Sequence, residues 1–122
     1  MDKQAILQAK HYHSRRDMNR QAIREQRRQD QYRQARTAIL KLGPKYPTIH
    51  RVYLYGSLVQ PGRYGPKSDI DVAVVSDDVA EESRFWQALE RELNCPIDLR
   101  PYQGAVAWAV DTYGECIYER EV

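Results

Sequence analysis

The first third of the chain contains no glycine and no proline, whereas the remainder contains all six glycines and all six prolines. Residues 1–42 are rich in Gln, Arg and Ala, which are all tolerated in helices. We therefore expect one long helix, or two helices with a break near His13–Asp17, that ends at Gly43 and Pro44. The last turns carry apolar residues at three- and four-residue spacing, which predicts packing against a core. These residues are Ala35, Ala38, Ile39 and Leu42.

The net charge of +2 is the sum of two opposite charges. Residues 1–42 carry eleven Lys/Arg and four Asp/Glu, or +7, and residues 43–122 carry eight and thirteen, or −5. A basic arm on an acidic body favours a partner for the arm or a charge-complementary surface, and the arm could join chains into a homo- or hetero-oligomer. Nucleic-acid binding by the arm is an alternative that we do not favour, because arginine clusters alone indicate only a preference for phosphate. The segment Arg24–Gln31 is polar on every face, so it must project into solvent, meet a charged partner or fray.

The length of 122 residues fits one domain, which we place at residues 43–122 behind a helical arm at residues 1–42. A mean hydropathy of -0.77, with no apolar run near the roughly 20 residues of a spanning helix, argues against a membrane protein. Charges throughout the first 20 residues argue against a secretory leader. Cys95 and Cys116 form no CxxC motif, so we expect no disulfide scaffold and a reducing, cytoplasmic location.

Beyond the arm, short apolar runs alternate with amphipathic segments. The expected strands are residues 51–55, 69–75, 97–100 and 116–118, and the expected helices are residues 81–93 and 104–113. This alternation predicts an α/β or α+β fold, in which a small sheet is flanked by helices. We expect the helices to place several large apolar side chains in the core. These are Phe85, Trp86, Leu89, Leu93 and Trp108.

The motif Ser68-Asp69-Ile70-Asp71 lies at the start of an expected strand. Side chains two apart on a strand point to the same face, so Asp69 and Asp71 lie side by side while Ile70 points into the core. Two such charges are costly unless a cation or a proton intervenes, and Mg²⁺ prefers oxygen ligands. Asp98, on a later strand, could complete a site for two ions or could merely cap its strand. Ser68 is either a turn former or a hydrogen-bond donor to the carboxylates.

Gly56 and Ser57 follow another expected strand. A glycine at a strand end lets a phosphate approach the backbone closely. A serine hydroxyl and exposed N–H groups at the following turn can hold phosphate oxygens. A metal site beside a phosphate cradle describes a nucleoside triphosphate site, in which two metals activate the attacking oxygen and stabilise the leaving pyrophosphate.

The segment GSLVQPGRYGPKSDID, with IDL downstream, resembles the nucleotidyltransferase superfamily that includes DNA polymerase beta and kanamycin nucleotidyltransferase. The short length is most similar to the minimal nucleotidyltransferase (MNT) group, whose members pair with HEPN proteins as antitoxins. The resemblance covers Tyr46 to about Glu119 and implies the nucleotidyltransferase fold with its small mixed sheet. It implies that Gly56 and Ser57 bind phosphate. It also implies three metal-binding carboxylates, of which the third helps to activate the acceptor hydroxyl: Asp69, Asp71 and Asp98.

The same resemblance implies an Mg²⁺-dependent transferase that moves a nucleoside monophosphate from an NTP, here ATP, to a tyrosine hydroxyl of a HEPN-type toxin. One departure is Leu58, which stands where many MNT members have an arginine. Arg63 or Lys67 could supply that charge to the nucleotide. The departure keeps an alternative open, in which the chain is a weak or inactive enzyme that neutralises its partner by binding.

Overall fold

The computed structural model describes residues 3–121, and it describes side chains from residue 14 onward. Met1, Asp2 and Val122, which belong to the predicted domains, lie outside the described residues. The helices are α1 (Lys3–Leu42), α2 (Val79–Leu93) and α3 (Gly104–Tyr113), with short 3-10 turns η1 (Gly43–Lys45) and η2 (Gly56–Val59). The strands are β1 (Ile49–Tyr55), β2 (Ile70–Ser76), β3 (Ile97–Pro101) and β4 (Glu115–Glu119).

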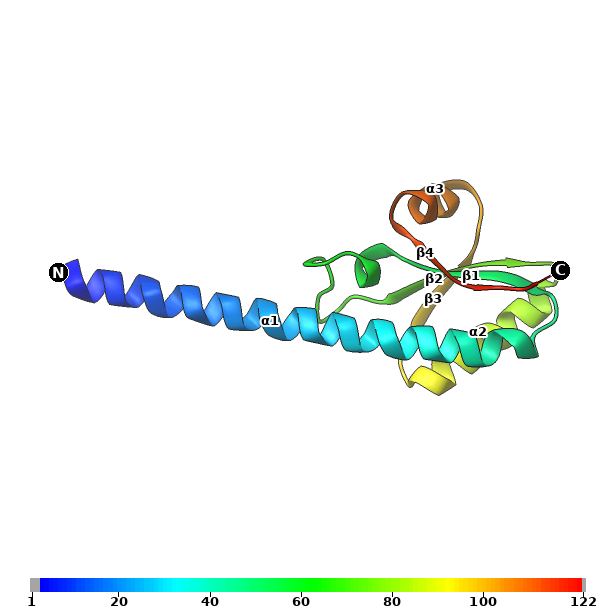
Figure 1. The fold of residues 1–122 in the computed structure, drawn as a ribbon, viewed down its shortest axis with the longest axis horizontal. Helices are drawn as coiled ribbons and strands as arrows, with labels where there is room; N and C mark the ends of the chain where they lie inside the picture. The colour runs from blue at the N-terminus through cyan, green and yellow to red at the C-terminus, as the bar shows by residue number, and fades with distance from the viewer. Residues whose placement is uncertain (1–2, 122) are drawn as a thin grey trace.

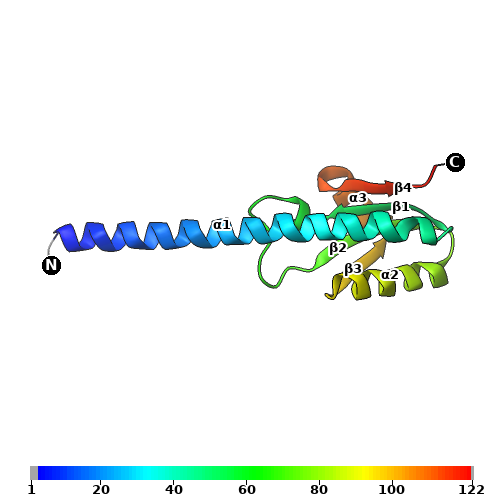
Figure 2. The same ribbon diagram turned by 60° about the horizontal axis from the view of Figure 1, so that its bottom comes forward.

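The four strands form one mixed sheet in the order β3-β2-β1-β4 (Figures 1 and 2). Strand β1 pairs antiparallel with both β2 and β4, whereas β2 and β3 run parallel. The parallel pair is joined through α2, as a crossover between parallel strands requires. The predicted small mixed sheet flanked by helices is therefore confirmed.

Helix α1 is continuous over its 40 residues, so the break near His13–Asp17 is not formed. At 1.5 Å per residue the helix is about 60 Å long. Its C-terminal half lies along the sheet, and its N-terminal half projects away from the rest of the protein (Figures 1 and 2). All side chains from residue 14 to residue 24 are exposed. The helix ends where Gly43 and Pro44 begin η1, as expected from their sequence.

The main core lies between the sheet and the helices α1 and α2. The four apolar residues predicted to anchor α1 are all buried there: Ala35, Ala38, Ile39 and Leu42. Along β2, Ile70, Val72 and Val74 face this core, as the predicted alternation requires. Phe85 and Leu89 of α2 are fully buried.

The two tryptophans were expected in the core, and both expectations are wrong. Trp86 is 36% exposed, and its indole N–H donates a 2.7 Å hydrogen bond to the Ile97 carbonyl at the sheet edge. Trp108 is 64% exposed. Helix α3 packs on the sheet through Val106 and Val110, which lie one turn apart. Because Trp108 is two residues from each of them, it is directed away from the sheet.

The second face of the sheet carries a smaller cluster beneath α3. Tyr53, Tyr55, Ala73 and Val110 are buried in it. No helix in the described part of the chain is long and apolar enough to cross a membrane. Both cysteines are free, as expected, with Cys95 partly buried and Cys116 exposed.

Candidate functional site

The turn after β1 is shaped by Gly56. This residue has φ +75°, a left-handed conformation that L side chains rarely adopt. A Cβ atom at this position would come 2.3 Å from Oδ2 of Asp71, so the turn also needs glycine for space. The side-chain amide of Gln60 donates to the Gly56 carbonyl at 3.1 Å, and the Gln60 N–H donates to the Ser57 carbonyl at 3.2 Å. Ser57 therefore lies in an ordered turn directly beside a carboxylate.

The strand pairing brings the predicted carboxylates to one region of the sheet. Asp71 is paired in register with Tyr55 of β1 on one side and with Asp98 of β3 on the other. Asp69 directly precedes β2 and is exposed. Because the neighbours Ile70 and Ile97 face the main core, Asp71 and Asp98 face the opposite side of the sheet.

Negative charge accumulates at Asp71. Burial, together with the charges of Asp98 and Asp69, raises the pKa of its carboxyl group to about 6 against the opposing effect of Arg100. Among the described residues, no three Asp, Glu, His or Cys side chains already converge as a metal site. The donor chemistry nevertheless fits Mg²⁺, because the residues are carboxylates and a cation would offset their mutual repulsion.

Arg100 belongs to this region although the sequence reasoning missed it. Its Nε donates a 3.2 Å hydrogen bond to Oδ1 of Asp98. The signal was present, because Arg100 follows Asp98 by two residues on the same strand and so shares its face. Tyr55 was expected only to pack in the sheet. It is buried, and burial together with the charges of Asp71 and Asp98 raises the pKa of its phenol.

The loop between η2 and β2 places the remaining predicted residues. Ser68 acts as a turn former, because its Oγ accepts a 2.8 Å hydrogen bond from the Gly65 N–H. Arg63 is exposed on this loop, and its N–H donates to the Gln60 carbonyl. Leu58 is fully buried in the main core. The residue after Ser57 therefore contributes packing rather than charge.

Helix α1 holds this loop through two charged side chains that the sequence reasoning did not single out. Arg28 donates from Nη1 to the Leu58 carbonyl at 3.0 Å, and it also pairs with Glu25 at 2.8 Å. Glu25 accepts a 3.1 Å hydrogen bond from the Gly62 N–H. The Arg28 guanidinium and this N–H lower the pKa of Glu25 to about 2. Two residues of the polar segment Arg24–Gln31 therefore contact η2 and the loop that follows it.

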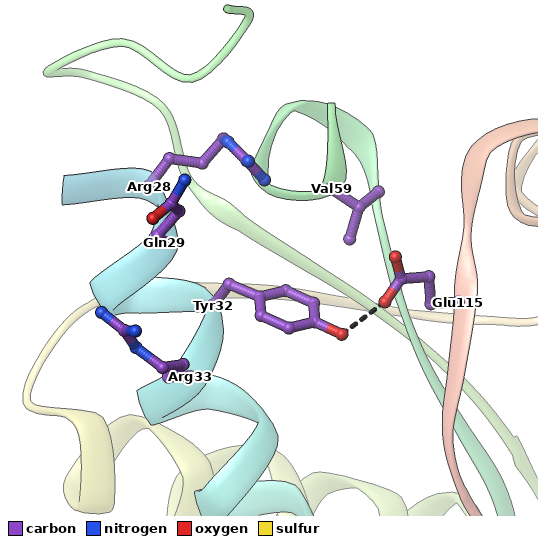
Figure 3. Close-up of a pocket in the computed structure, with 6 residues that line it drawn as sticks. All are labelled: Arg28, Gln29, Tyr32, Arg33, Val59 and Glu115. Atoms are coloured by element: carbon purple, nitrogen blue, oxygen red, sulfur yellow. Dashed lines mark hydrogen bonds between the residues drawn. The ribbon is translucent and has the colours of Figure 1, made fainter. Parts of the chain in front are cut away.

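A pocket of about 350 Å³ opens beside this contact, between α1, η2 and β4 (Figure 3). Tyr32 donates a hydrogen bond to Glu115 across it. The pocket is lined by Arg28, Gln29, Tyr32, Arg33, Val59 and Glu115. The pocket lies on the α1 side of the sheet and is separate from Asp69, Asp71 and Asp98.

Residues 37–122 match the family described as Polymerase beta, Nucleotidyltransferase. The chain belongs to this family. The match confirms the predicted resemblance and includes the whole sheet, the Gly56 turn and the three carboxylates. It begins within α1, so most of the basic arm lies outside it. No sequence among the curated proteins matches the chain.

Solved structures with the same fold come from toxin-antitoxin complexes. An MntA-HpeT toxin-antitoxin mutant is 26% identical with a TM-score of 0.57, and the alignment covers 70% of this chain and 74% of that one. A toxin-antitoxin structure with AMP-PNP is 28% identical with the same TM-score and coverage. The tri-AMPylated Shewanella oneidensis HEPN toxin in complex with an MNT antitoxin is 25% identical, with a TM-score of 0.50 over 70% and 71% of the two chains. This nucleotidyltransferase thus shares its fold with proteins of HEPN-MNT complexes.

Proposed function

We propose that this nucleotidyltransferase is an MNT-type antitoxin that transfers AMP from ATP to a hydroxyl group of a HEPN-type partner protein. The observation that carries the proposal is the position of Asp71, in register with Asp98 and in contact with the Gly56 turn. This arrangement puts oxygen donors for a cation directly beside backbone that a phosphate can approach. The similar structures with AMP-PNP and with a tri-AMPylated HEPN toxin support ATP as the donor and a protein as the acceptor.

The spacing of the carboxylates adds support. The similar MntA-HpeT complex is a mutant with glutamate in place of two aspartates that are two positions apart. Asp69 and Asp71 have the same spacing, with Asp69 directly before β2 and Asp71 near its start. We infer that these two residues are the metal-binding pair of this chain.

In the proposed reaction, the Gly56 turn and the Ser57 hydroxyl hold oxygens of the triphosphate, and the exposed Arg63 is a candidate for a further phosphate contact. The acceptor oxygen forms a bond to the α-phosphorus, the bond from that phosphorus to the β-phosphate oxygen breaks, and pyrophosphate leaves. The carboxylate of Asp98 takes the proton of the acceptor hydroxyl, and Arg100 positions that carboxylate through its hydrogen bond.

Asp69, Asp71 and Asp98 would together hold two Mg²⁺ ions. Bound Mg²⁺ would neutralise phosphate charge and lower the pKa of the acceptor hydroxyl. The protein's own contribution is to hold Asp71 and Asp98 in register despite their repulsion, on paired strands whose other face is anchored in the main core, with Asp69 directly before β2.

The test is a transfer assay with ATP labelled at the α-phosphate, Mg²⁺ and the HEPN-like product of a neighbouring gene. We expect label on the partner with the wild type and none with Asp71→Asn. Asp17→Asn is the matched control, because it makes the same chemical change at an exposed position on the projecting part of α1. No transfer by the wild type, or equal transfer by Asp71→Asn, would end the catalytic proposal.

A second candidate function is neutralisation of the partner by binding alone. The observation that favours it is the complete burial of Leu58, which leaves the turn without a charge at this position. Calorimetry separates the two functions. Tight binding of the partner without any binding of ATP and Mg²⁺ supports the binding function, whereas nucleotide binding that depends on Asp71 supports the enzyme.

A further inference from the structure

The projecting part of α1 carries a row of arginines. Arg16, Arg20, Arg24 and Arg27 follow one another at intervals of four, four and three residues on one continuous helix. At 100° per residue they lie within about 80° around the helix axis, and the row is about 16 Å long. We call these four residues the arginine row.

The charge of the arginine row is not neutralised within the described part of the chain. All four side chains are exposed, and none forms an ion pair with a described carboxylate. The next arginines along α1 differ, because Arg28 pairs with Glu25 and Arg33 pairs with Asp30. The row is therefore available to an anionic partner, whereas the arginines nearer the sheet already have one.

Between residues 14 and 27, where its side chains are described, α1 lacks the apolar centre that a protein interface needs. The exposed large apolar side chains in this range are Met18 and Ile23, which are 66% and 69% exposed. They are five positions apart, so they point about 140° apart around the helix and form no stripe. Protein interfaces draw most of their binding energy from a few centrally buried side chains, among which Trp, Tyr and Arg are enriched, and residues 14–27 offer no aromatic residue for such a centre. A polar helix with unpaired arginines instead fits a polyanion, because guanidinium groups bind phosphate in two-pronged geometry.

We propose that the arginine row binds the phosphate backbone of double-stranded DNA. The part of α1 before residue 21 projects away from the body (Figures 1 and 2), whereas Arg24 lines an open pocket of about 370 Å³ beside Gly62 and Tyr64 of the loop that follows η2. The major groove of B-form DNA admits an α-helix between its two backbones. The major groove of duplex RNA is too deep and narrow to admit an α-helix. At the end of the arginine row nearest the sheet, Arg27 lines a pocket of about 200 Å³ together with Lys67 and Asp69. The carboxylate of Asp69 repels phosphate, so the DNA contacts end at this pocket.

This binding does not depend on the proposed AMP transfer. The four residues lie outside the family match, which begins at residue 37. The full chain can therefore be tested without ATP or a partner protein. Anisotropy of a labelled duplex DNA of arbitrary sequence measures the affinity. With four phosphate contacts, log K should fall against log salt with a slope of about −3.6, so the affinity falls about 10²-fold between about 50 mM and about 200 mM salt.

The decisive variant replaces Arg16, Arg20, Arg24 and Arg27 with Gln. It should lose affinity by about 10²-fold or more at low salt, while circular dichroism shows unchanged helix content. The control removes the same number of charges from exposed arginines elsewhere and should change the affinity only a few-fold. It replaces Arg33, Arg36, Arg84 and Arg91 with Gln.

Two competitors complete the test. Duplex RNA of the same sequence and poly-glutamate should both compete for the protein more weakly than duplex DNA. Tighter binding of the RNA would overturn the assignment to DNA. Equal binding of poly-glutamate would also overturn it, because the row would then bind any acidic polymer. Equal loss of affinity in the two quadruple variants would also overturn the proposal, because overall charge rather than the row would then be responsible.

Discussion

Asp71 and Gly56 lie in direct contact, such that a Cβ atom at residue 56 would come 2.3 Å from Oδ2 of Asp71. The contact joins the end of β1 to the start of β2. The Gly56 turn and the Asp71 carboxylate therefore have a fixed separation, and a side chain at residue 56 would disturb both.

Gly56→Ala should be more damaging than Gly62→Ala. Both glycines have a left-handed φ, +75° and +80°, so alanine at either costs about 1–2 kcal/mol of stability. Nothing lies within 4 Å of a Cβ atom at Gly62, whereas one at Gly56 meets Asp71. Urea unfolding should show the larger loss for Gly56→Ala, and only this variant should lose ATP binding. Equal losses in both would show that the contact with Asp71 carries no energy.

Asp71→Asn should stabilise the metal-free protein in a pH-dependent manner. The pKa of Asp71 is raised from 3.8 to about 6 in the folded state, so the fold prefers the protonated acid. The cost of ionisation is absent below pH 3.8, grows as the pH rises to about 6 and is constant above that value. Such a shift corresponds to about 3 kcal/mol, which solvent screening at this half-exposed group reduces to about 1 kcal/mol.

The measurement is the difference in unfolding free energy between Asp71→Asn and the wild type, in EDTA, across this pH range. Because the amide mimics the neutral acid, the unfolding free energy of the variant should increase relative to that of the wild type as the pH rises. A difference that stays constant with pH would contradict the raised pKa that burial and the neighbouring carboxylates give Asp71.

Mg²⁺ with a non-hydrolysable ATP analogue should raise the Tm of the wild type. A ligand that binds only the folded state adds about 2.7 kcal/mol of stability at a concentration 100-fold above its Kd. Asp71→Asn should show no such shift, because it removes a proposed cation ligand, whereas Asp17→Asn should behave like the wild type. The assay is thermal unfolding with each ligand alone and with both. An undiminished shift in Asp71→Asn would remove this residue from the nucleotide site.

Arg28→Ala should loosen the loop that follows η2. Arg28 donates to the Leu58 carbonyl and orients Glu25, which holds the Gly62 N–H. Hydrogen bonds of charged groups contribute about 1.5–3 kcal/mol each, and the Arg28 side chain is only 12% exposed. Hydrogen exchange should accelerate at residues 56–63. Arg33→Ala is the control, since Arg33 forms only an exposed pair with Asp30. Equal exchange in the two variants would show that Arg28 does not hold the loop.

Sequence spacing predicted which side chains are buried more accurately for β2 than for the helices that cover the sheet. Strand alternation predicted that Ile70 faces the core while Asp69 and Asp71 face away, and Ile70 is 3% exposed. The same reasoning applied to α2 and α3 failed for Trp86 and Trp108. Helical spacing identifies an apolar stripe but not its width, and the width depends on how closely each helix approaches the sheet.

Local chemistry in the sequence was sufficient to determine the period of each element, the end of α1 at Leu42 before Gly43, the glycine at the turn after β1 and the inward direction of Ile70. These properties depend on backbone geometry over a few residues. Only the tertiary structure decided that Asp98 pairs in register with Asp71, and that Arg28 reaches the carbonyl of Leu58 thirty residues away. Strand order and helix docking result from packing of the whole core, and no local spacing records them.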